Sequence, residues 1–205
     1  MQGLYLVTPN WDDTSRLLQL TGQALQAAPV ALLQYRHKEA GAVLRHEQAA
    51  ALQALCRRHR VPFIINDHVE LCEELDADGV HLGGTDAEVA QVRARLGRRK
   101  IIGASCYGEL SRALMAQDAG ASYVAFGGFY PSRVKQYEVS TPPDILDRAR
   151  DVIRVPTVVI GGMTPHNAAP LVARGAHMVA AISSVYQADS VAQAVRQFQS
   201  LFTQQ

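Results

Sequence analysis

The chain has 205 residues, of which 48% are hydrophobic and 19% are charged, a composition typical of a globular protein and not of a disordered one. Its formal net charge of +1 excludes a general electrostatic attraction to nucleic acid, so a site for a polyanion would have to be local. No apolar run reaches the roughly 20 residues that a membrane-spanning helix needs.

Short apolar runs alternate with helical patterns through the first half of the chain. Buried strands are predicted at residues 4–8, 29–35, 61–65 and 79–82. The first strand stops at Pro9, and Asp12–Ser15 then supplies cap residues for an amphipathic helix. Helical patterns also follow the other three strands.

The second half repeats this rhythm. Strands are predicted at residues 100–105, 122–126, 156–160 and 178–182. A long loop over residues 127–141 separates the sixth strand from its helix, and Thr164 and Pro165 supply the N-cap and first position of the seventh helix. The chain is therefore predicted to contain eight strands that alternate with eight helices.

Strict alternation of strands and helices implies a parallel sheet. Eight such units in about 200 residues predict an α/β protein with a single (β/α)8 TIM barrel, whose one domain spans residues 1–205. No Pro-, Gly- or Ser-rich linker divides the chain. A doubly wound open sheet is the alternative, and the absence of G-x-G-x-x-G after the first strand weakens it.

The end of the second predicted strand carries an unusual set of polar residues. Because strand side chains alternate, Gln34, Arg36 and Lys38 should leave on one face, and Tyr35 and His37 on the other. An arginine fork beside a lysine point charge suits a phosphate or a pyrophosphate. The alternative is a strand whose charged end is merely solvated.

Polar residues also follow the other predicted strands. In (β/α)8 barrels the active site lies at the C-terminal ends of the strands. The residues at those ends are Gln34, Arg36, Lys38, Asn66, Asp67, Asp86, Ser105, Ser132, Lys135, Gly161, Gly162, Ser183 and Ser184. If the fold is a barrel, these residues converge on one rim.

Two carboxylates belong to this rim, Asp67 after the third strand and Asp86 after the fourth. Carboxylates beside several cations suggest Mg²⁺ shared between the protein and substrate phosphates. Each aspartate can instead cap the helix that follows it, since Asp is a preferred N-cap, and the two roles can coexist.

Gly161 and Gly162 would let a phosphate approach bare backbone, and Ser183 could add a hydroxyl, although tight turns also need glycine. His81 lies within a strand and is interpreted as a hydrogen-bonded core histidine. The odd count of three cysteines, without C-x-x-C spacing or a visible secretory leader, favours reduced thiols and a cytoplasmic protein. Cys106 has no base implied nearby, so it is not expected to be a nucleophile.

Seven short motifs occur in order along the chain. They are Gln34–Lys38, Ile65–Asp67, Gly79–Gly83 with Asp86, Gly103–Ser105, Pro131–Ser132 with Lys135, Ile160–Thr164, and Ala181–Ser183. This set resembles the thiamine phosphate synthase family, and the resemblance runs from Leu4 to the last predicted helix. It implies an Mg²⁺-dependent transferase that joins a pyrimidine methyl diphosphate to a thiazole phosphate and releases pyrophosphate.

The resemblance also implies roles for individual residues. The pyrimidine diphosphate would be bound by Gln34, Tyr35, Arg36, His37, Lys38, Asn66, Ser105 and Lys135. The thiazole phosphate would be bound by Ser132, Arg133, Val134, Gly162, Ile182 and Ser183. Asp67 and Asp86 would hold Mg²⁺, and the catalytic set would be Arg36, Lys38, Lys135 and Ser105.

The chain departs from the family pattern at a few positions. Val134 stands where the family usually has a second threonine, Gly84 where it has glutamine, and Tyr107 where a histidine is usual. A related branch, the thiazole tautomerases, typically keeps that histidine and lacks the full charged set. A thiazole isomerase and a non-catalytic barrel that binds thiamine intermediates are therefore the alternatives. The two substrates are the expected partners, without nucleic acid or membrane, and a homo-oligomer is compatible with the sequence.

Overall fold

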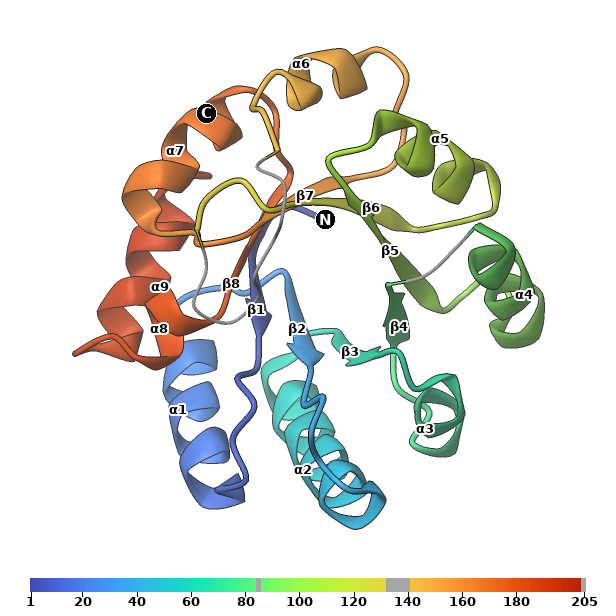
Figure 1. The fold of residues 1–205 in the computed structure, drawn as a ribbon. Coiled ribbons are helices and arrows are strands. Elements are labelled where there is room, and N and C mark those ends of the chain that lie inside the picture. The colour runs from blue at the N-terminus through green and yellow to red at the C-terminus, as the bar shows by residue number, and fades with distance from the viewer. Residues whose placement is uncertain (84–85, 132–140, 204–205) are drawn as a thin grey trace.

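The computed structural model describes residues 1–83, 86–131 and 141–203 and contains a closed barrel of eight parallel strands in chain order (Figure 1). The strands are β1 (Gly3–Val7), β2 (Leu32–Tyr35), β3 (Phe63–Asn66), β4 (Gly79–Leu82), β5 (Ile101–Tyr107), β6 (Tyr123–Gly127), β7 (Thr157–Ile160) and β8 (Met178–Ala181). β8 pairs with β1 and closes the barrel, so the predicted (β/α)8 fold is confirmed and the open sheet is excluded.

Nine helices lie within the described residues and surround the barrel. They are α1 (Thr14–Ala27), α2 (Ala42–His59), α3 (Val69–Glu74), α4 (Asp86–Leu96), α5 (Leu110–Asp118), α6 (Ile145–Arg150), α7 (Pro165–Ala173), α8 (Ser183–Tyr186) and α9 (Val191–Ser200). The prediction of eight helices missed α8. A four-residue helix is too short to show a 3.6-residue apolar period, so the sequence gives no periodic signal for it.

The predicted helix starts agree with the observed caps. The Asp13 carboxylate accepts a hydrogen bond from the backbone N–H of Arg16 and caps α1. Thr164 and Asn167 form a reciprocal capping box at the start of α7, with Pro165 in the first helical position. The starts of α1 and α7 therefore both follow from ordinary capping chemistry.

The hydrophobic core has two layers. The larger layer lies between the strands and the surrounding helices. The smaller layer fills the barrel and includes Tyr5, Leu32, Ile64, Tyr123, Val158 and Met178. Ala125 and Ala180 also point into the barrel, where their small side chains leave a cavity beside them.

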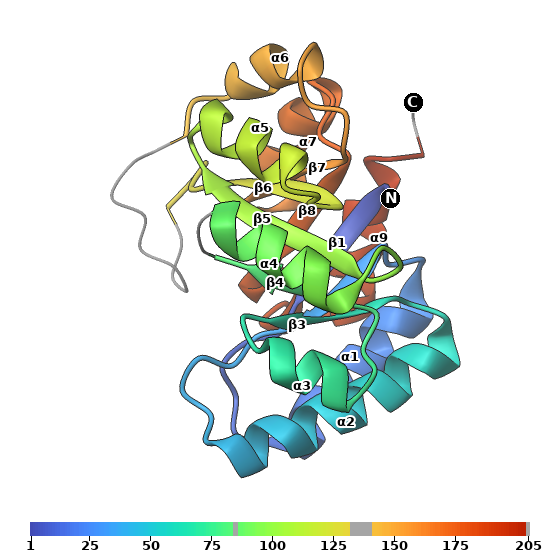
Figure 2. The ribbon, with the colours of Figure 1, turned by 90° about the vertical axis from the view of Figure 1, so that its right-hand side faces the viewer.

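The two ends of the barrel differ in what they carry. In the view of Figure 2 the connections that follow the strands project to one side, and both chain termini lie at the other. The described polar residues that follow the strands therefore gather at one end of the barrel, as predicted.

Among the described residues no helix is long and apolar enough to cross a membrane.

All three cysteine side chains are buried in the outer core layer. Burial raises the pKa of the Cys56 thiol to about 12 and that of the Cys72 thiol to about 11. Both therefore stay protonated at neutral pH, and the buried Cys106 thiol donates to the Ala104 carbonyl oxygen, with a sulfur–oxygen distance of 3.6 Å. These environments belong to packed core thiols and not to a nucleophile.

We therefore expect the native protein to resist alkylation at all three cysteines. Incubation with iodoacetamide at pH 8 followed by intact mass spectrometry should show mainly unmodified chain. The same treatment in guanidinium should add three groups, which controls for the reagent. Rapid labelling of one thiol in the folded protein would contradict the burial.

Candidate active site

A narrow cavity of about 20 Å³ lies at the carboxyl ends of the strands. One wall is polar and is formed by Tyr5, Gln34, Arg36, His81 and Ser105. The rest of the lining is apolar and comes from Val7, Ala125, Val158, Ile160, Ala180 and Ile182. A lining with one polar and one apolar side suits a flat, heteroatom-bearing ring that binds at the mouth of this cavity.

The residues that end β2 alternate as predicted. Gln34 and Arg36 line the cavity, and Lys38 is exposed. Tyr35 faces the helices, where its hydroxyl donates to Gln48 Oε1 at 3.0 Å. His37 also points away from the cavity, with its Nε2 2.9 Å from the carboxylate of Asp12.

The side chains of Tyr35 and His37 therefore hold the end of β2 against the helical layer. The backbone N–H of Ala40 donates to His37 Nδ1 at 3.1 Å, which ties down the loop that carries Lys38. Burial raises the pKa of Tyr35 to about 12, so its hydroxyl keeps its proton. Direct substrate contact by these two side chains stays a prediction from the resemblance.

Arg36 is held by the neighbouring strand. Its backbone N–H donates to Thr8 Oγ1 at 2.8 Å, and the residue is only 6% exposed. An arginine on the wall of a cavity can donate several hydrogen bonds to an anion that enters it. Its position suits the predicted phosphate contact.

Asp67 lies at the end of β3 in an unusual backbone conformation. Its φ angle is +62°, in the left-handed region that costs most residues free energy but that Asp and Asn tolerate better. The residue before α3 is His68, which makes no side-chain cap, so the alternative that Asp67 caps this helix is wrong. The Asp67 side chain is exposed and accepts a hydrogen bond from Asn66 Nδ2 at 2.7 Å.

The surroundings of Asp67 fit a Mg²⁺ ligand. A Cβ added to Gly83 would lie 3.7 Å from Asp67 Oδ1, so this carboxylate faces the end of β4, from which the chain runs to Asp86. The described residues contain no group of three His, Cys, Asp or Glu side chains that could hold a metal. Mg²⁺ typically keeps several waters and binds one or two carboxylates plus substrate phosphates, and such a site needs no protein cage.

A chain of hydrogen bonds crosses the barrel beneath the cavity. Ser105 Oγ lies 2.9 Å from His81 Nε2, and His81 Nδ1 lies 2.9 Å from the Tyr123 hydroxyl. The Tyr123 hydroxyl lies 2.6 Å from that of Tyr5, which accepts from Gln34 Nε2 at 2.6 Å. The two ends of this chain, Gln34 and Ser105, are both predicted substrate ligands.

The sequence analysis predicted only part of this chain of hydrogen bonds. His81 is hydrogen-bonded as expected, but it also lines the cavity. Tyr5 and Tyr123 belong to predicted strands, and no polar role was predicted for either side chain. A tyrosine on the inward face of a barrel strand is a usable signal, because its buried hydroxyl must find a partner there. The Tyr123 ring also needs Gly103 opposite it, where an added Cβ would lie 2.0 Å from the ring carbon Cζ.

The β6 and β7 connections lie against each other. Gly162 has a φ of +58°, and a Cβ there would lie 2.3 Å from the Pro131 carbonyl oxygen. The glycine is therefore needed for the turn and for this close approach, whether or not a phosphate also binds. Ile182 lines the cavity and precedes α8, whose first residue is Ser183.

Several predicted residues lie outside the described part of the chain. They are Gly84, Ser132, Arg133, Val134 and Lys135, and the side chain of Asp86 belongs with them. The described residues on either side of segment 132–140 are hydrogen-bonded to neighbouring backbone. The Tyr130 N–H donates to the Gly161 carbonyl at 3.2 Å, and the Thr141 N–H donates to the Gly128 carbonyl at 2.9 Å.

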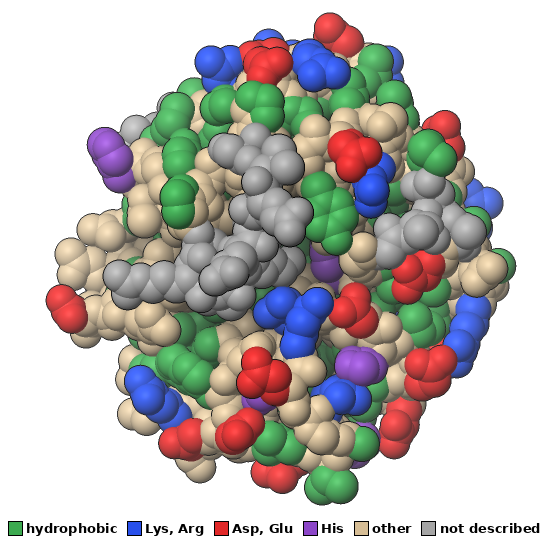
Figure 3. Space-filling model, viewed as in Figure 1, with side chains coloured by type: hydrophobic (Ala, Val, Ile, Leu, Met, Phe, Trp, Pro, Cys, Tyr) green, Lys and Arg blue, Asp and Glu red, His purple; other side chains and the backbone are tan. Residues whose placement is uncertain are grey.

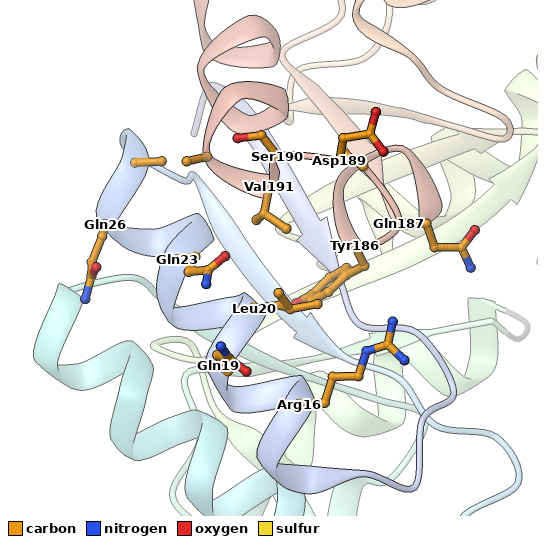
Figure 4. A pocket seen from close by; sticks show the side chains of 13 residues that line it. Arg16, Gln19, Leu20, Gln23, Gln26, Tyr186, Gln187, Asp189, Ser190 and Val191 are labelled. Carbon is orange, nitrogen blue, oxygen red and sulfur yellow. The ribbon is translucent and has the colours of Figure 1, made fainter.

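The surface around the cavity carries charges of both signs. Figure 3 shows Lys or Arg side chains beside acidic ones near the centre of the face, below the undescribed residues. A larger groove of about 730 Å³ lies elsewhere, between α1 and the α8–α9 connection. Figure 4 shows its lining of neutral amides from Gln19, Gln23 and Gln26, with one Arg16 and one Asp189, and no convergent set of catalytic groups.

Comparisons with known proteins agree with this geometry. Residues 4–185 match the family model described as thiamine monophosphate synthase. The chain is 61% identical over 202 residues to a thiamine-phosphate synthase of Janthinobacterium sp. (strain Marseille), covering 98% of this chain and 97% of that one. A second relative of that description, from Nitrosomonas eutropha, is 45% identical over 98% of this chain and 95% of its own.

A solved structure gives the same result. The thiamine phosphate pyrophosphorylase from Pyrococcus furiosus superposes with a TM-score of 0.85 at 27% identity. The match covers 99% of this chain and 96% of that one. The sequence matches and the structural match therefore indicate the same family over nearly the whole chain.

Proposed function

This chain belongs to the thiamine monophosphate synthase family and has its transferase activity, and on that premise we propose which residues carry the reaction. The reaction transfers the 4-amino-2-methylpyrimidin-5-ylmethyl group from its diphosphate to thiazole phosphate. Pyrophosphate leaves and thiamine phosphate forms. The observation that carries the assignment is that Gln34, Arg36 and Ser105 line one cavity.

The polar wall of this cavity binds the pyrimidine diphosphate. Gln34 and Ser105 contact the ring, and Arg36 and Lys38 contact the diphosphate, together with Asn66 and Lys135. The thiazole phosphate binds to Gly162, Ile182, Ser183 and residues 132–134. Support for the first group is that Gln34, Arg36 and Ser105 share a lining, and for the second that Ile182 belongs to the opposite, apolar side.

The chemical step is substitution at the exocyclic methylene carbon. The bond to the diphosphate oxygen breaks, and the thiazole nitrogen forms the new bond to that carbon. Arg36, Lys38 and Lys135 neutralise the negative charge that grows on the leaving pyrophosphate, and the protein forms no covalent bond. Asp67 and Asp86 would hold Mg²⁺, which supplies further charge neutralisation when it is bound.

We expect pyrophosphate release only when both substrates are present, and we expect a chelator to stop it. A coupled assay for pyrophosphate, with Mg²⁺ added or removed by EDTA, measures this directly. Restored activity after Mg²⁺ is added back controls for damage by the chelator. Full activity in EDTA would contradict the metal assignment while leaving the transferase intact.

The same assay separates the alternatives. A tautomerase needs a general acid or base, typically a histidine, and this chain has Tyr107 at that position. Its hydroxyl donates to the Gly83 carbonyl at 3.3 Å. Tyr107→Phe should therefore keep most of the pyrophosphate release. Metal-independent isomerisation of the thiazole, lost in this variant, would favour the tautomerase, and binding without turnover would favour a regulator.

A further inference from the structure

The hydrogen-bond chain from Gln34 to Ser105 can be given one direction, which starts from the orientation of the Gln34 amide. Gln34 Nε2 can only donate, so the Tyr5 oxygen accepts from it. Tyr5 is fully buried, and the other partner of its hydroxyl is Tyr123. A buried hydroxyl proton needs an acceptor, so Tyr5 donates to Tyr123.

The same reasoning carries through to Ser105. The Tyr123 oxygen accepts from Tyr5, so its own proton goes to His81 Nδ1. His81 then holds its proton on Nε2 and donates it to Ser105 Oγ. The Ser105 hydroxyl proton is thereby left to point toward the cavity that Ser105 lines.

The two tyrosines keep the protons that this direction requires. Burial raises the pKa of Tyr5 and of Tyr123 well above the ordinary value for tyrosine. Both hydroxyls therefore keep their protons near neutral pH. The hydrogen-bond chain therefore presents one pattern to the cavity: a donor at Ser105 and the carbonyl acceptor Oε1 at Gln34, whose amide is oriented by the bond from one of its two N–H groups to Tyr5.

We propose that Tyr5, Tyr123 and His81 are positioning residues that hold Ser105 as a donor and Gln34 as an acceptor, so that the cavity selects an aminopyrimidine over its oxo counterpart. The inference rests on the proposed placement of the pyrimidine ring between Gln34 and Ser105. An aminopyrimidine offers an amino N–H donor beside a ring-nitrogen acceptor, which matches this pattern. The oxo form offers an acceptor beside a ring N–H, and both contacts are reversed.

Alone, Ser105 could rotate its hydroxyl and Gln34 could flip its amide to suit either ring. Because the five groups are hydrogen-bonded in series, neither end can reverse alone without leaving a buried polar group unpaired, so the two contacts are set together. Sites built to match a hydrogen-bonding edge reject the mismatched edge for this reason. The selectivity should therefore depend on a hydroxyl that never touches the ligand.

Tyr123→Phe removes that hydroxyl and keeps the ring. The probes are the 4-amino-2-methylpyrimidine methyl monophosphate, which has no pyrophosphate to lose, and its 4-oxo counterpart, with affinities measured by calorimetry. We expect the wild type to prefer the amino probe, and we expect the preference to fall about tenfold in Tyr123→Phe, the scale of one hydrogen bond. Affinity for thiazole phosphate should not change.

Tyr186→Phe is the matched control. Tyr186 is also a fully buried tyrosine with one side-chain partner, Thr21 Oγ1 at 2.8 Å, and it lies outside the cavity lining. The Tyr186→Phe variant should keep the wild-type preference for the amino probe. An unchanged preference in Tyr123→Phe, in a protein that still releases pyrophosphate, would overturn the inference and leave the proposed function standing.

Nitrogen-15 NMR of the wild-type protein tests the direction without any loss of fold. The His81 signals, assigned by their absence in His81→Gln, should show the proton on Nε2 and an unprotonated Nδ1. A proton on Nδ1 would mean that the hydrogen bonds run in the opposite direction, and it would overturn the inference. In Tyr123→Phe, Nδ1 loses its donor, so the tautomer signature should change there and stay constant in Tyr186→Phe.

Discussion

Asp67→Asn should reduce kcat by about 100-fold or more while the barrel stays folded, the scale for loss of one group that stabilises transition-state charge. Asn keeps the shape, can still accept from Asn66 Nδ2, and tolerates the φ of +62°. Only the negative charge is lost. The measurement is pyrophosphate release over a range of Mg²⁺ concentrations, and the apparent Mg²⁺ requirement should rise.

Asn is a sharper choice than Ala at this position. Asp67→Ala would combine loss of the ligand with a left-handed backbone that Ala adopts poorly. Asp76→Asn is the matched control, since Asp76 also has a positive φ and pairs with Lys100 on the exposed surface. It should retain activity. Wild-type activity of Asp67→Asn at limiting Mg²⁺ would remove Asp67 from the metal site.

Arg36→Lys should weaken transition-state binding by about 2–3 kcal/mol, which lowers kcat/KM roughly 30- to 150-fold. The charge remains, but the planar fork that grips two phosphate oxygens is lost. The buried position of Arg36 on the cavity wall leaves little room for a lysine to reorient. Steady-state kinetics with the pyrimidine diphosphate varied, at saturating thiazole phosphate, measures the change.

Arg93→Lys separates a catalytic loss from a structural one. Arg93 donates to the carbonyl oxygens of Gly97, Lys100 and Gly120 and to Ser122 Oγ, away from the cavity. Its replacement should lower the melting temperature and leave kcat/KM of the folded protein unchanged. Equal kinetic losses in the two variants would mean that Arg36 acts through stability alone.

The fold could be predicted from the sequence because its strands are short, apolar and bounded by turn residues. Residues 79–82 were predicted with the observed bounds, and the other strands shifted by a few residues at their ends. The second strand begins at Leu32 and not at residue 29, since an apolar run shows burial but not where pairing starts. The four-residue α8 carried no period to detect.

The candidate site was predictable to the extent that it depends on strand ends. Alternation placed Gln34 and Arg36 on the inward face correctly. Whether Asp67 caps a helix depended on the residue at which α3 begins, which no residue pattern specifies to within one position. Tyr5 and Tyr123 were missed because an aromatic residue in a buried strand has the same sequence signature whether or not its hydroxyl joins a network.

The close approach of the Tyr123 ring to Gly103 has an evolutionary consequence. The two residues face each other across β5 and β6, and no other residue at position 103 leaves room for the ring. A lineage that gained a side chain at 103 would first have to give up the aromatic ring at 123. The constraint therefore runs one way: position 103 cannot gain a side chain while position 123 keeps its aromatic ring.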